Sequence, residues 1–123
     1  MNDRELLEAA AKVAGVRYDH AASKPHPTSG AFWGLWLVFD DEPSEYAPRY
    51  WNPLTDDGDA LRLAVKLRMN VEVWPDIVSV TTTHRATGDK DASEQAGSDL
   101  NAATRRAIVR VAAATLARLV GEA

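Results

Sequence analysis

Apolar residues recur along the chain at two spacings, one typical of helices and one typical of strands. Helical spacing, with an apolar residue at every third or fourth position, covers residues 2–14, 51–67 and 99–120. Alternation or strand-like composition covers residues 16–20, 31–39, 71–74 and 77–84. The predicted elements therefore follow one another in the order αββαββα.

Residues 51–67 open as a turn and continue as a largely apolar helix. The Asn-Pro pair at the start disfavours helix. Three polar side chains that can cap the helix follow, namely Thr55, Asp56 and Asp57. The polar stripe of the helix is narrow and consists of Asp59, Arg62 and Lys66. We therefore expect the helix to be covered on more than one side, with Trp51 packed over its start.

Residues 31–39 are apolar at every position, so no alternation indicates a solvent-facing side. This pattern predicts a strand buried on both faces, between helices. Trp33 and Trp36 are then expected in the core, with stacking on a cofactor as the alternative. Gly34 indicates a bulge or a close approach by a helix.

Residues 71–74 and 77–84 predict a hairpin, because Pro75-Asp76 forms a turn between them. Residues 85–98, with two glycines and alternating charges, are expected to form a mobile loop.

The whole pattern predicts one α+β domain over residues 1–123. We expect a three-layer α/β/α sandwich, with three helices around a four-stranded, mainly antiparallel sheet.

Composition narrows the function classes. The 123 residues include no cysteine, so disulfides and thiolate chemistry are excluded, and no stretch is apolar for the length of a membrane span. The expected location is the cytosol.

The last predicted helix carries several arginines. Arg106 and Arg110 lie on its exposed side but are too few for a nucleic-acid surface. Arg105 is expected to pair with a carboxylate.

Negative charge is concentrated in the first half of the chain. Residues 1–61 carry 5 basic and 11 acidic side chains, whereas residues 62–123 carry 9 and 7. Much of the excess lies between residues 40 and 59, which favours a basic partner unless the carboxylates only cap a helix and face solvent. The candidate partner-binding residues are Asp40, Asp41, Glu42, Glu45, Tyr46, Tyr50 and Trp51.

Catalytic and metal-binding motifs are weak. His20, His26 and His84 are scattered and lack the spacing of a helical zinc site. The acidic residues 56–59 lack the alternation of a calcium loop, and no phosphate-binding loop or nucleophile elbow is present. We therefore predict neither a cofactor nor a metal, and no enzymatic activity.

One resemblance to a known family rests on three stretches. Residues 51–67 resemble a motif of the phage ABA-sandwich domain, a family of small bacteriophage and prophage proteins. The first helix and residues 103–110 resemble that family's opening and closing helices. The resemblance implies a helix-sheet-helix layering and an accessory protein of phage origin, with no assigned catalytic residues.

Three functional hypotheses follow. The first is a protein that binds a host or phage protein through its acidic surface, such as a subunit of a bacterial defence complex, and inhibits it. The second is a structural protein that self-assembles through the edge of the strand at residues 71–74. The third is a small hydrolase or nucleotide-modifying enzyme that uses His20, His84 and nearby acidic side chains.

Overall fold

The computed structural model describes residues 1–25, 27–41, 49–84, 88–95 and 97–121. In this part of the chain the helices are α1 (Asp3–Ala14), α2 (Asp57–Lys66) and α3 (Leu100–Gly121). The strands are β1 (Tyr18–Asp19), β2 (Leu35–Leu37), β3 (Tyr50–Trp51), β4 (Asn70–Val73), β5 (Ile77–His84) and β6 (Gly88–Gln95). The α+β class and the three predicted helices are confirmed.

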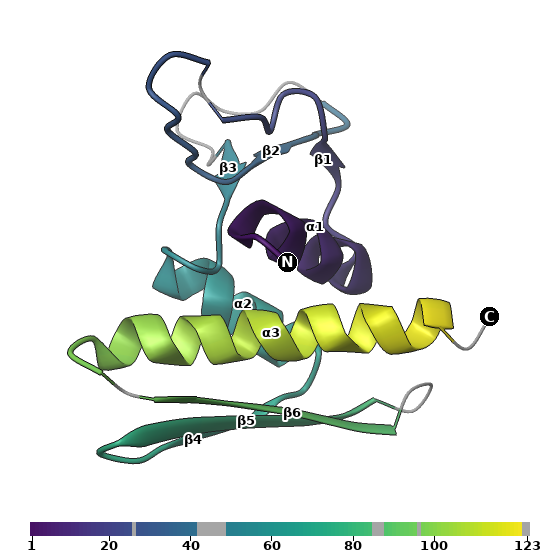
Figure 1. The fold of residues 1–123 in the computed structure, drawn as a ribbon. Helices are drawn as coiled ribbons and strands as arrows, with labels where there is room; N and C mark the ends of the chain where they lie inside the picture. Colours follow the sequence, from purple (N-terminus) through teal and green to yellow (C-terminus); the bar gives the residue numbers. More distant parts are fainter. Residues whose placement is uncertain (26, 42–48, 85–87, 96, 122–123) are drawn as a thin grey trace.

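The strands form two antiparallel sheets of three strands, in the orders β1-β2-β3 and β4-β5-β6. The predicted single four-stranded sheet is therefore wrong. In Figure 1, α3 lies along the larger sheet, α1 lies beyond α3, and the small sheet is outermost. The helices consequently separate the two sheets instead of enclosing one. In the described part of the chain, β1, β2 and β3 are two or three residues long and pair only with one another.

The larger sheet buries one face under α3. Val78 and Val80 are fully buried, whereas Ser79 between them is partly exposed, as a two-residue period requires. The predicted hairpin between β4 and β5 is confirmed. The loop predicted at residues 85–98 is wrong over residues 88–95, because β6 pairs with β5 along its whole length. Residues 85–87 and 96 lie outside the described residues. Its Gly-Asp-Lys-Asp sequence has low strand propensity, which pairing overrides here.

Helix α1 packs along α3, and both helices contribute many alanines to the core. Small side chains allow the two backbones to approach closely. Asn2 and Glu5 cap the start of α1 reciprocally, with Glu5 N donating to Asn2 Oδ1 over 2.8 Å. Gly15 ends the helix in the left-handed conformation, at φ 73°.

The predicted nine-residue strand is wrong, because only Leu35–Leu37 pair as β2. Leu35 is fully buried, but 60% of Trp33 is exposed and Phe39 is also exposed. Gly34 interrupts the segment with a φ of 132°. A Cβ at Gly34 would lie 2.6 Å from the carbonyl oxygen of Trp51, so the segment that approaches this glycine is β3 and not the expected helix. With helices on one side only, the small sheet cannot bury both faces.

Helix α2 is less covered than predicted. Asp56 caps it by accepting from Asp59 N over 2.8 Å. Trp51 is buried in the core cluster that also includes Leu63 and Ala64 of α2. Ala60, Leu63 and Ala64 are buried. Leu61 and Val65, however, are 65% and 68% exposed. An apolar ridge on α2 therefore faces outward.

Candidate protein-binding face

Four aromatic side chains gather on the small sheet and the segments beside it. They are Trp33, Trp36, Phe39 and Tyr50, and we call this set the aromatic face. The ring of Tyr50 lies 6.1 Å from that of Trp33 and 5.2 Å from that of Trp36, measured between centroids. The second pair meets edge to face, a favoured aromatic geometry. Trp33, Phe39 and Tyr50 are exposed although each carries a large apolar surface.

Arg49 lies within this face. Its guanidinium carbon is 4.4 Å from the centroid of Trp36 and 5.3 Å from that of Phe39. At these distances the cation is attracted to both rings. Arg49 also anchors the sheet, because its carbonyl accepts from Leu37 N over 2.8 Å. The stacked arginine therefore holds Trp36 and Phe39 in place, although none of the described helices covers the two rings.

Acidic side chains border the aromatic face. A hollow of about 350 Å³ is lined by Trp36, Phe39, Arg49, Asp19, Asp40 and Asp41, among others. Asp40 pairs with Arg17 over 2.9 Å, but both side chains are mostly exposed. Surface ion pairs of this kind contribute little to stability. Asp40 and Asp41 are therefore available to a basic side chain of a partner.

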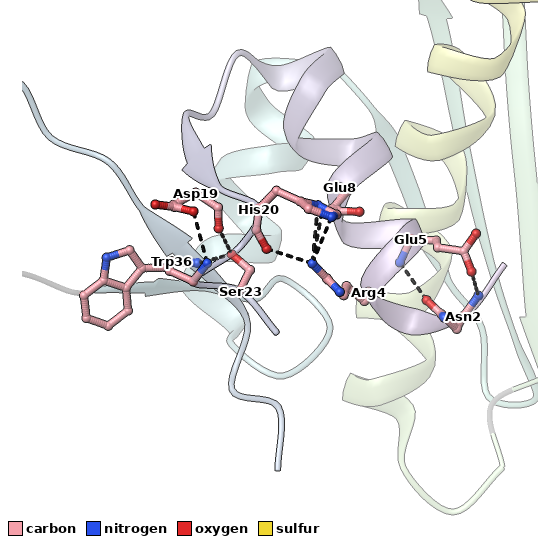
Figure 2. Close-up of polar contacts among 9 residues, drawn as sticks. Asn2, Arg4, Glu5, Glu8, Asp19, His20, Ser23 and Trp36 are labelled. Atoms are coloured by element: carbon pink, nitrogen blue, oxygen red, sulfur yellow. Dashed lines mark hydrogen bonds and ion pairs between the residues drawn. The ribbon is translucent and has the colours of Figure 1, made fainter. Parts of the chain in front are cut away.

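A buried hydroxyl group fixes the backbone beneath the face (Figure 2). Ser23 Oγ accepts from Trp36 N over 2.8 Å and donates to the carbonyl of Asp19 over 2.6 Å. Asp19 Oδ1 also accepts from Ala22 N over 3.0 Å, which closes the turn that carries Ser23. These bonds tie β1 to β2, so the orientation of Trp36 is set by backbone contacts.

The turn after β1 is attached to α1 by charged groups (Figure 2). Arg4 donates to the carbonyl of His20 over 2.8 Å, and the His20 ring contacts Glu8. Tyr18 lies nearby and is partly buried. Burial raises the pKa of the Tyr18 phenol above its usual 10.0, and the neighbouring Glu8 raises it further. The small sheet is thus docked on α1 through polar as well as apolar contacts.

The candidate partner-binding residues have different positions. Asp40 and Asp41 border the hollow, and Tyr50 belongs to the aromatic face. Trp51 is buried in the core and is only 7% exposed, so it cannot contact a partner. Glu42, Glu45 and Tyr46 lie outside the described residues. Sequence reasoning did not assign Trp33, Phe39 and Arg49 to this face. An unbroken apolar run indicates a core strand for Trp33 and Phe39, and the role of Arg49 depends on its position beside the rings in space.

Other candidate groups have structural partners. Residues 56–59 cap and stabilise α2, where Asp59 pairs with Arg62 over 2.7 Å. Arg105 pairs with Asp57 over 2.7 Å, which confirms the expected carboxylate partner. Within the described ranges, no three His, Asp or Glu side chains are close enough to hold a metal ion. His26 and the side chain of His84 lie outside the description.

Basic residues of α3 also pair with acids. Arg106 contacts Asp3 over 3.1 Å, and Arg110 contacts Glu94 over 2.7 Å.

No helix in the described part of the chain is both long and apolar enough to cross a membrane. In comparisons with known proteins, the chain matches no family model, no curated protein and no solved structure. The aromatic face therefore has to be interpreted from its own chemistry.

Proposed function

We propose that the protein acts by binding another protein through the aromatic face, and not by catalysis. The observation that carries this proposal is the exposure of Trp33, Phe39 and Tyr50 around a stacked arginine. Tryptophan, tyrosine and arginine are enriched among the residues that dominate binding energy at protein interfaces. A partner that covers these rings gains roughly 25 cal/mol for each Å² of apolar surface removed from water.

The packing of the face supports the proposal. Trp36 and Tyr50 pack edge to face, Arg49 stacks on Trp36, and Ser23 fixes the Trp36 backbone. A surface that is ordered before binding loses little conformational entropy when the partner arrives. The aromatic face thus resembles a preformed recognition surface.

The chemistry of the face suggests the kind of partner. Asp40 and Asp41 lie beside the rings, so a complementary surface would combine an apolar hollow with lysine or arginine side chains. A basic surface of this kind occurs on nucleases, which bind nucleic acid. Together with the resemblance to phage ABA-sandwich proteins, this makes a subunit of a bacterial defence complex our proposed partner. The proposed setting is the cytosol of the bacterial host.

Affinity capture tests the proposal. The tagged chain is incubated with a bacterial host lysate, and retained proteins are identified by mass spectrometry at low and high salt. We expect a retained partner that is lost with Trp33→Ala and weakened by Asp40→Asn/Asp41→Asn. Leu119→Ala is the control, because Leu119 is also exposed and lies on α3, outside the aromatic face. Equal capture by wild type and Trp33→Ala would contradict the proposal.

The enzyme hypothesis has less support. His20 contacts both Arg4 and Glu8, and these contacts attach the turn after β1 to α1. We therefore propose a structural role for this histidine. The corresponding test is His20→Asn, which we expect to lower the free energy of unfolding. Unchanged stability would contradict the structural role and return His20 to consideration as a catalytic group.

A further inference from the structure

Strand β4 is an edge strand beside an apolar groove. It pairs with β5 on one side, and within the described residues no strand pairs with its other side. The groove has a volume of about 400 Å³ and lies between β4, α2 and the start of α3. Its lining includes Ala60, Leu61, Ala64, Val73, Leu100 and Ile108.

The hydrogen-bonding groups of β4 can be assigned from the turn that follows. Trp74 N donates to the carbonyl of Ile77 over 2.8 Å, so this pair is a hydrogen-bonded pair. Such pairs alternate along an antiparallel ladder, which places Glu72 and Asn70 in the next two. The backbone groups of Val71 and Val73 therefore point away from β5, toward the open edge.

The surface around this edge is apolar. Leu61 and Val65 are exposed on α2, Leu100 at the start of α3, and Val73 and Trp74 at the end of β4. Clusters of exposed apolar side chains near an open strand edge mark an association surface. Natural edge strands that stay unpaired commonly carry lysine, proline or a bulge, whereas Asn70–Val73 has none of the three.

We propose that β4 pairs antiparallel with β4 of a second copy of this chain, forming a two-fold dimer. The dimer joins two three-stranded sheets into one of six strands. The ridge of Leu61 and Val65 on each copy then borders the shared interface. A standard interface covers roughly 800 Å² on each partner. Trp74, which is exposed, is the largest side chain of this rim, and aromatic side chains bury about 150–250 Å² each.

Charge decides the register of the pairing. If the two-fold axis passes through Glu72, Glu72 of one copy lies directly opposite Glu72 of the other, and like charges repel. If the axis passes through Val71, Asn70 of each copy lies opposite Glu72 of the other. An amide can donate to a carboxylate, so this second register is self-complementary. We therefore assign the axis to Val71.

Sedimentation velocity of the full chain over a concentration series tests the dimer. We expect a concentration-dependent dimer, and a tenfold or greater increase in its dissociation constant with Val73→Lys or Leu61→Lys. Val38→Lys is the control, because Val38 is also exposed but lies on the small sheet. Unfolding curves of all variants confirm that they fold. A monomer up to about 1 mM, or a dimer weakened only by Val38→Lys, would overturn the proposal.

Cysteine cross-linking tests the register, since the natural chain contains no cysteine. Asn70→Cys and Glu72→Cys are oxidised separately and as a mixture in a glutathione buffer. With the axis at Val71, the mixture forms the most disulfide, because residues 70 and 72 of the two copies are directly opposite. Dominant cross-linking of Glu72→Cys alone would overturn this register. Neither result bears on the aromatic face, which lies on the other sheet.

Discussion

The two sheets have the same number of strands and the same antiparallel pairing, but they differ in how they bury apolar side chains. In the larger sheet, β5 and β6 are eight residues long and α3 covers one face. In the small sheet, no strand exceeds three residues, and its outer side carries exposed aromatic rings. Residues 31–39 are more apolar than β5, yet they carry the side chains that remain in contact with water.

The difference shows that burial depends on pairing length and helix cover more than on the hydrophobicity of a segment. Val78 and Val80 are buried because a long strand holds them under α3 in a regular alternation. Trp33 precedes Gly34, which leaves the extended conformation, so its side chain is not held in that alternation. Exposed rings that the fold does not use are available for binding.

The largest expected effect distinguishes two neighbouring residues of the small sheet. Leu35→Ala removes a fully buried side chain and should lower the free energy of unfolding by about 2–5 kcal/mol. Trp33→Ala should lower it by less than about 1 kcal/mol, because the ring is mostly exposed. Urea unfolding of both variants measures the difference. Equal losses would mean that the aromatic face is part of the core.

A smaller effect is expected at the glycine that interrupts this segment. Gly34→Ala introduces a Cβ 2.6 Å from the Trp51 carbonyl and 2.9 Å from Asn52 Cβ. The strained backbone and the contact should together cost about 1–3 kcal/mol. Gly30→Ala is the control, because it also has a positive φ but no atom within 4 Å. Thermal unfolding that ranks Gly30→Ala as the more damaging change would refute this explanation.

In the larger sheet, a buried hydroxyl group ties β5 to the end of α2. Thr82 Oγ1 donates to the carbonyl of Leu67 over 2.8 Å, and both residues are buried. Thr82→Val keeps the shape but leaves this carbonyl without its donor, which should cost about 1–2 kcal/mol. Thr81→Val, on the other face of β5, should change stability by less than about 0.5 kcal/mol. Chemical denaturation of the pair provides the measurement.

The smallest effect concerns Tyr18 and appears only at alkaline pH. Burial raises the pKa of this phenol, so the folded protein holds the proton more tightly than the unfolded chain. Its contribution to stability is complete below pH 10.0 and is lost as pH rises through the folded pKa. Wild type should therefore lose more stability than Tyr18→Phe between about pH 9 and about pH 11. Parallel pH profiles would contradict this assignment.

Local signals in the sequence predicted the helices well. Asn2, Asp56 and Gly15 all cap helices, because capping depends on residues that are close in the chain. The sheets were harder to predict, because strand pairing depends on distant segments. No local pattern near residues 88–95 indicates that they will form a strand paired with β5.

The candidate face was predicted only in part for a related reason. Charge and composition indicate Asp40, Asp41 and Tyr50, whereas the apolar run predicts Trp33 and Phe39 in the core. An apolar run cannot indicate whether a helix will cover it. Arg49 had no signal in the sequence, because its role depends on the positions of Trp36 and Phe39 in space.

The central claim is that the aromatic face serves binding and not folding. The most direct test measures two properties of Trp33→Ala together: its unfolding midpoint and its retention of the partner captured by wild type. We predict an unfolding midpoint close to that of wild type and loss of the partner. A destabilised variant that still retains the partner would contradict the claim.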